Sequence, residues 1–178
     1  HDADYNYKTA DNCVGITYAE EQVGFLAGYA AVKDGMTKLG YMGGMAVPAV
    51  VKYGYGFVQG AEYAAQELGM ADGSIELMYN YTGGFDATPE AQNQAASWYN
   101  NGTEVIFAAG GAVGNSVMAA AEAAGTKVIG VDVDQSGESE TVITSAMKGL
   151  GTSVYDMIAA YYNGSFPGGE NKVYDAAN

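Results

Sequence analysis

KVIGVDVDQ, residues 127–135, is a short apolar run that leads directly into an acidic segment. The run at residues 128–131 predicts a buried β-strand, and the residues after it predict a loop. Open α/β sheets bind their ligands in the crevice beyond the carboxyl ends of the strands, so this loop is a candidate for ligand contact. Alternation along an extended segment predicts that Asp132 and Asp134 point to the same side while Val133 turns inward.

The same order of strand and helix extends along the chain on both sides of this stretch. Predicted strands span 13–18, 38–42, 75–79, 104–108, 128–131 and 142–146, and predicted helices span 19–34, 50–68, 88–99, 115–124 and 151–162. Continuous apolar strands joined by helical crossovers predict a mostly parallel central sheet covered on both faces, which is a three-layer α/β sandwich. Residues 1–12 predict a loose polar lead-in, and the ending KVYDAAN shows no helix or strand pattern.

The composition limits the class of protein. The 178 residues suffice for one domain or two small ones with a sizeable core. No apolar run reaches the roughly 18 residues that a membrane-spanning helix needs. The chain has 21 Asp and Glu against 7 Lys and no Arg, for a net charge of −14. This charge argues against nucleic acid and anionic membranes as partners and is typical of a surface that faces the outside of a cell.

Few residues are available for nucleophilic or metal chemistry. Cys13 is the single cysteine, so no disulfide can form within the chain, and we expect a buried, inert thiol. His1 is the single histidine, and its terminal position argues against a histidine-dependent triad. We therefore expect no metal and no cofactor. The polar opening also lacks a secretory signal, which for an extracellular chain predicts a mature protein or a fragment.

A glycine-rich turn, GGAVGN at residues 110–115, separates a predicted strand from a predicted helix. Gly110 and Gly111 would let the backbone approach a ligand closely, and the helix N-terminus would offer N–H donors to an oxygen or an anion. The spacing differs from a dinucleotide fingerprint, and the lysine of a P-loop is absent. A tight structural turn and a backbone contact to a ligand remain the two main interpretations.

Four side chains are further candidates. Asp132 and Asp134 could bind adjacent sugar hydroxyls, hold a cation, act as an acid and a base, or form a surface turn, and Asp132 is the preferred hydroxyl acceptor. Phe85, in the loop TGGFD, belongs to no apolar stripe and could stack on a flat ligand or anchor the loop. Lys148 follows a predicted strand and could donate to a base or a carbonyl, pair with Asp132, or lie on the surface.

Seven segments carry a resemblance to a known family. They are AEEQVGFLAG (19–28), KLGYMGGMAVPAV (38–50), YGYGFVQGAEYA (53–64), YNYTGGFDATPEA (79–91), EVIFAAGGAVGNSV (104–117), KVIGVDVDQ (127–135) and VITSAMKG (142–149). Together, and in this order, they resemble the basic membrane protein family over residues 12–164. Members of that family are substrate-binding lipoproteins of ABC transporters, and the best-known ones bind purine nucleosides.

The resemblance implies a type I periplasmic-binding fold, in which two α/β lobes clamp a ligand. Because 178 residues are too few for both lobes, we expect residues 1–178 to supply the second lobe alone, with its core at about 12–150 and hinge crossings at both ends. The last helix would then pack on the missing first lobe of the same protein. Cys13 is not in a lipobox, so the lipid anchor would belong to the full-length precursor.

The resemblance also implies roles for the candidate residues. Phe85 would stack on the base, Gly110 or Gly111 would offer backbone contact, Asp132 would accept from ribose hydroxyls, and Lys148 would donate from the rim. The expected partners are a nucleoside, an ABC transporter permease and the missing lobe, with a possible dimer through the exposed lobe face and no nucleic acid. The alternatives are an extracellular sensor domain and a small α/β hydrolase that uses Asp132 and Asp134.

Overall fold

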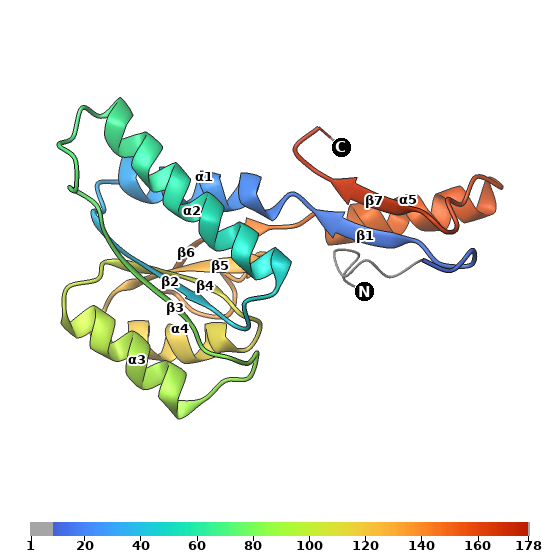
Figure 1. The fold of residues 1–178 in the computed structure, drawn as a ribbon. Helices are drawn as coiled ribbons and strands as arrows, with labels where there is room; N and C mark the ends of the chain where they lie inside the picture. Colours follow the sequence, from blue (N-terminus) through green and yellow to red (C-terminus); the bar gives the residue numbers. More distant parts are fainter. Residues whose placement is uncertain (1–8, 178) are drawn as a thin grey trace. The chain divides into compact units, whose positions relative to one another are not determined.

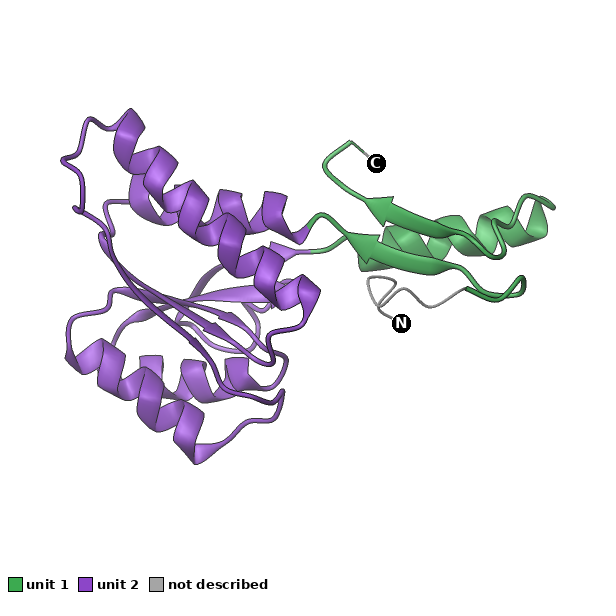
Figure 2. Cartoon of the chain, in the orientation of Figure 1, with its two compact units in different colours: residues 1–19, 148–178 green, residues 20–147 purple. Residues whose placement is uncertain are grey.

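The computed structural model describes residues 9–177, so His1 lies outside the described part. The chain forms two compact units (Figure 2). One unit is continuous and comprises residues 20–147. The other is built from two separate segments, the residues up to 19 and the residues from 148 onward. Each unit has its own sheet.

The continuous unit is a three-layer α/β sandwich, as predicted. Its elements are α1 (Glu20–Lys33), β2 (Lys38–Gly43), α2 (Pro48–Glu67), β3 (Glu76–Tyr81), α3 (Pro89–Asn100), β4 (Val105–Ala109), α4 (Val113–Ala124), β5 (Lys127–Asp132) and β6 (Val142–Met147). The sheet order is β3-β2-β4-β5-β6, and every described strand pair is parallel. Helices α1 and α2 cover one face, and α3 and α4 cover the other (Figure 1).

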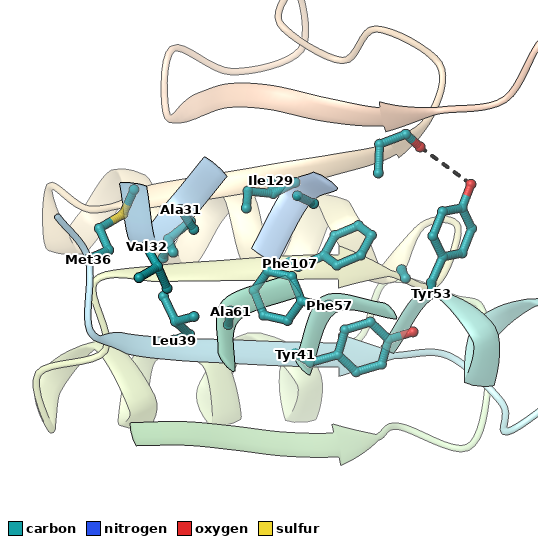
Figure 3. Close-up of a cluster of buried hydrophobic side chains, with 14 of the residues drawn as sticks. Ala31, Val32, Met36, Leu39, Tyr41, Tyr53, Phe57, Ala61, Phe107 and Ile129 are labelled. Atoms are coloured by element: carbon teal, nitrogen blue, oxygen red, sulfur yellow. Dashed lines mark hydrogen bonds between the residues drawn. The ribbon is translucent and has the colours of Figure 1, made fainter. Parts of the chain in front are cut away.

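The inner strands β2, β4 and β5 are buried on both faces, as parallel strands covered by helices require, whereas the edge strands β3 and β6 are partly exposed. On the face of α1 and α2, Tyr41, Phe57 and Phe107 form the centre of an aromatic core (Figure 3). On the opposite face, Trp98 and Ile106 belong to a second core beneath α3 and α4. Two separate apolar cores thus hold the central sheet in place and fix the positions of its strand ends.

Helices α1 and α2 approach each other backbone to backbone. A Cβ atom at Gly28 would overlap the carbonyl oxygen of Phe57, and one at Gly60 would overlap the carbonyl oxygen of Phe25. Glycine is therefore required at the crossing point for steric reasons. The close approach holds α1 against α2, and Val32 of α1 packs in the same core as the strands.

The second unit contains β1 (Gly15–Tyr18), α5 (Leu150–Tyr162) and β7 (Asn171–Tyr174). The expectation that the ending KVYDAAN forms no strand is wrong, because β7 pairs in parallel with β1. The pattern was not visible in the sequence because the partner strand lies at the other end of the chain. An apolar groove of about 470 Å³ lies within this unit, lined by β1, α5 and Phe166.

Cys13 differs from its prediction as well. It is exposed and lies in a turn closed by a 2.8 Å hydrogen bond from its own N–H to the carbonyl of Ala10. The expected strand at residues 13–18 begins only at Gly15, so the thiol precedes the strand and is not buried by it. In the described part of the chain, no helix combines the length and the apolar character that a bilayer crossing requires.

Candidate functional site

The carboxyl ends of β2, β3, β4 and β5 form one edge of the central sheet. From β2 the chain steps outward to β3, and it then returns to the other side of β2 and continues through β4, β5 and β6. The direction of winding thus changes between β2 and β4. In open α/β sheets, this topological switch point is where ligands bind.

Phe85 lies in the loop after β3 and close to the ends of β2 and β4. Its ring carbons would be the nearest atoms to a Cβ placed at Gly44, and its own Cβ lies 3.6 Å from the Cβ position of Gly111. The Phe85 carbonyl accepts a 2.9 Å hydrogen bond from the N–H of Ala112. The side chain nevertheless remains 39% exposed. The backbone is therefore anchored, while part of the ring faces solvent.

The turn after β4 presents backbone at the same edge. Gly110 is buried, and a Cβ there would lie 2.7 Å from the backbone nitrogen of Gly44. Gly111 has a φ of 58°, in the left-handed region that favours glycine. Within residues 9–177, the N–H groups of Gly110 and Gly111 donate no hydrogen bond. Their N–H groups are thus available beside Phe85.

Asp132 ends β5 in an unusual conformation. With a φ of 67°, it is the only non-glycine residue of the described chain in the positive-φ region. The N–H of Val133 donates to the carbonyl of Val131 at 2.8 Å, so Asp132 is the central residue of a γ-turn. Such a turn with positive φ is strained for an L-residue, and strain of this kind clusters at functional sites.

Tyr53, on α2, holds the side chain of Asp132. Its hydroxyl lies 3.2 Å from Oδ1 of Asp132 and 3.3 Å from the carbonyl oxygen of Ala146, at the end of β6. Figure 3 shows Tyr53 at one end of the aromatic core, next to Phe107. Burial and then the negative charge of Asp132 raise the pKa of Tyr53 above its ordinary value, so the hydroxyl remains a donor at neutral pH.

The prediction that Asp132 and Asp134 point to the same side assumed that Val133 turns inward, and this assumption is wrong. Val133 is 49% exposed and does not turn inward, because the γ-turn at Asp132 interrupts the strand alternation. Asp134 is exposed, and its Oδ1 accepts a 2.9 Å hydrogen bond from the N–H of Ser136, which lowers its pKa. Asp134 therefore stabilises the loop, whereas Asp132 contacts Tyr53.

Gln135 supports the same loop from within. Its side chain is 8% exposed, and its Oε1 accepts a 2.7 Å hydrogen bond from the N–H of Val131. Its own N–H donates to the hydroxyl of Ser145 on β6 at 3.1 Å. Val131 before Asp132 and Gln135 after it are thus held by hydrogen bonds within the chain itself.

Lys148 belongs to the other compact unit. Its ammonium group lies 5.5 Å from the centre of the Tyr18 ring, which places it over β1 of that unit. The other predicted site residues, Phe85, Gly110, Gly111, Asp132 and Asp134, belong to the continuous unit. The structure therefore brings Phe85, the two glycines and Asp132 to one sheet edge and assigns Lys148 to a separate unit.

Tyr53, Gly44 and Gln135 were not predicted as parts of this edge. Tyr53 fitted the apolar stripe of a helix, and with 15 tyrosines in the chain no single one stood out. Gly44 follows a predicted strand, and that position was the only sequence signal that could have identified it.

The resulting edge combines an aromatic ring, backbone N–H donors and a carboxylate, which suits a flat ligand with hydroxyl groups. In the described chain, no cluster of three or more Asp, Glu, His or Cys could hold a metal ion.

Comparison with known proteins identifies the family. The family model for PnrA-like ABC transporter substrate-binding proteins matches residues 2–178. The ABC transporter nucleoside-binding protein BmpA of Lactococcus lactis is 30% identical over 190 residues, covering 96% of this chain and 52% of that protein. Basic membrane protein D of Borreliella burgdorferi is 34% identical over 154 residues, covering 84% of this chain and 43% of that protein. The chain thus spans about half the length of these relatives.

Solved structures agree on the fold. A solute-binding protein of an ABC transporter system from Aeropyrum pernix gives a TM-score of 0.79 at 23% identity, covering 94% of this chain and 48% of that one. A transcriptional activator of the comK gene from Bacillus halodurans gives a TM-score of 0.76 at 21% identity, covering 93% of this chain and 55% of that one. At these identities the likeness concerns the fold, which is the type I periplasmic-binding fold, and the family follows from the sequence match. The chain belongs to the PnrA-like family of ABC transporter substrate-binding proteins, which are solute-binding proteins and not enzymes.

Proposed function

We propose that this chain is a nucleoside-binding lobe of an ABC importer, with purine nucleosides as the favoured ligands. Phe85 stacks on the base, Gly110 and Gly111 donate from the backbone, and Asp132 accepts from the sugar hydroxyls. Lys148, which belongs to the other unit, is proposed as a further donor to the ligand in the full protein. Asp134 lies in the same loop and has a supporting role.

The observation that carries this proposal is the convergence of Phe85, the two glycines and Asp132 on the switch-point edge of one sheet. The backbone of Phe85 is anchored and the residue is 39% exposed, which leaves part of the ring for a flat base. Asp132 ends β5, the strand next to β4, which Gly110 follows, and a carboxylate there can accept from vicinal hydroxyls. The name of the Lactococcus relative gives independent support, since that protein is called nucleoside-binding.

The rest of the protein is part of the proposal. We depart here from the expectation that the chain supplies the second lobe alone. The continuous unit would be the second lobe, and the unit of β1, β7 and α5 would belong to the first lobe, whose remainder would cover its apolar groove. This inference rests on the relatives, which are about twice as long as the chain. The full-length protein would work outside the cytoplasm, anchored by lipid, and would deliver its ligand to a membrane permease.

Calorimetric titration with purine nucleosides, pyrimidine nucleosides, free bases and sugars tests this proposal, on this chain and on the longer chain that carries both lobes. We expect purine nucleosides to bind the longer chain, and this chain more weakly, because half of the contact surface is absent. Phe85→Ala should weaken binding about tenfold or more, as the loss of a base-stacking aromatic does. Tyr55→Ala, which removes an exposed aromatic on α2, is the matched control and should leave binding unchanged.

The proposal fails if the longer chain binds a sugar or another metabolite and no nucleoside. It also fails if Phe85→Ala and Tyr55→Ala bind nucleosides equally well. Turnover of a nucleoside that disappears in Asp132→Asn would instead favour a hydrolase.

A further inference from the structure

Tyr53 is buried at the N-terminal half of α2, and its hydroxyl reaches the strand ends of β5 and β6. The residue is 2% exposed, and its ring packs edge-on against Phe107 at a centroid distance of 5.6 Å. A ring fixed in this way places the hydroxyl in one position with little loss of entropy on binding. The hydroxyl therefore acts as a fixed donor at the sheet edge.

The carboxylate that accepts a hydrogen bond from this hydroxyl belongs to Asp132, a residue with a strained backbone. Positive φ is unfavourable for an L-residue, so the γ-turn at Asp132 needs support from its surroundings. Gln135 secures the backbone on one side through the N–H of Val131. Tyr53 contacts the side chain itself, at Oδ1.

We infer that Tyr53 is a positioning residue of the proposed nucleoside site: its buried hydroxyl orients the Asp132 carboxylate toward the hydroxyl groups of the ligand's sugar. The inference rests on the proposed function, since it assigns Tyr53 a role through Asp132. Tyr53 itself does not contact the ligand. The hydroxyl lies 3.2 Å from Oδ1 of Asp132 and 3.3 Å from the carbonyl oxygen of Ala146, and a carboxylate is the stronger acceptor of the two.

The chain offers a matched control. Tyr99 is also a buried tyrosine, and its hydroxyl donates at 2.9 Å to the carbonyl of Lys127. Lys127 begins β5, whereas Asp132 ends it. Tyr53→Phe and Tyr99→Phe thus each remove one buried hydroxyl that contacts β5, at opposite ends of the same strand.

The first measurement needs no ligand. Amide chemical shifts and hydrogen exchange of Asp132 and Val133 are recorded by NMR for wild type, Tyr53→Phe and Tyr99→Phe. Tyr53→Phe should shift both amides and accelerate exchange of the Val133 amide, which closes the γ-turn. Tyr99→Phe should leave them unchanged. Identical spectra at these amides in Tyr53→Phe and wild type would overturn the positioning role, whatever the protein binds.

The second measurement uses inosine and 2′,3′-dideoxyinosine as probes, on the longer chain with both lobes. Tyr53→Phe should weaken inosine binding about tenfold, the effect of one lost hydrogen bond to a charged group, and should barely change binding of the dideoxy analogue. In Asp132→Gly, which tolerates the positive φ, adding Tyr53→Phe should cause no more than a twofold further loss. Equal losses for both probes, or additive losses in the double variant, would overturn the inference. Failure of wild type to bind either probe would instead refute the proposed function.

Discussion

Gly111 and Gly125 share a backbone conformation but differ in what surrounds them. Their φ values are 58° and 66°, and a Cβ at Gly111 would lie 3.4 Å from the Phe85 carbonyl oxygen, whereas a Cβ at Gly125 would meet nothing within 4 Å. Gly125 is the C-cap of α4, away from the switch-point edge. The pair separates the effect of backbone strain from the effect of contact with Phe85.

Gly111→Ala and Gly125→Ala should each lower the free energy of unfolding by about 1 kcal/mol, because each places an L-residue in the left-handed region. Only Gly111→Ala should weaken nucleoside binding, since its methyl group would lie in contact with Phe85 at the ligand-facing edge, 3.4 Å from the Phe85 carbonyl oxygen. Urea denaturation measures the first effect and calorimetry the second. Equal binding by the two variants would show that the Phe85 loop does not depend on Gly111.

At this scale the sequence predicts residue types better than residue conformations. Phe85, Gly110, Gly111 and Asp132 could be nominated because each follows a predicted strand. The γ-turn at Asp132 could not be predicted, because its setting involves groups distant in sequence: the Asp132 carboxylate contacts a tyrosine hydroxyl 79 residues away. The outward position of Val133 follows from that turn and was missed for the same reason.

Among the elements, the crossing of α1 and α2 is the most constrained contact. Gly28→Ala should destabilise the continuous unit by about 2–3 kcal/mol, because the overlap with the Phe57 carbonyl forces the two helices apart. This loss exceeds the 0.5–1 kcal/mol that alanine normally gains over glycine in a helix, by rough estimate. Thermal or urea unfolding of the variant measures it.

Gly114→Ala, in α4, is the control for this prediction. A Cβ there would come no closer than 3.8 Å to another atom, so the variant should be as stable as wild type or slightly more stable. If Gly28→Ala is also neutral, the two helices have room to separate, and the close crossing does not determine stability.

Helix and strand limits in the continuous unit were predicted to within about two residues, because their signals are local. Thr88, for example, accepts a 3.1 Å hydrogen bond from the N–H of Ala91 and caps α3, with Pro89 as the first helical residue. β7 was missed because its strand character depends on pairing with β1, from Gly15 opposite Asn171 onward. Local patterns cannot report such a distant partner.

At the scale of the whole molecule, the two units differ in how much apolar surface they bury. The continuous unit has two apolar cores. In α5, Ser153 is the one buried residue of the described helix, and Tyr161 and Tyr162 are largely exposed. A helix with so little burial depends on tertiary contacts that the chain supplies only in small number.

We therefore expect the amides of α5 and β7 to exchange with deuterium faster than those of α2 and β4, by at least about a hundredfold at low protein concentration. At high concentration, exchange in α5 should slow, because the apolar groove lined by Val154, Ile158 and Tyr161 favours association with a second copy when the rest of the lobe is absent. Hydrogen exchange with mass spectrometry at two concentrations, with light scattering on the same samples, measures both effects.

Slow exchange of α5 at every concentration would mean that this unit is stable by itself. A strictly monomeric sample with concentration-independent exchange would exclude the dimer. In the longer chain, α5 should be protected at every concentration, since the rest of the lobe would occupy the same groove.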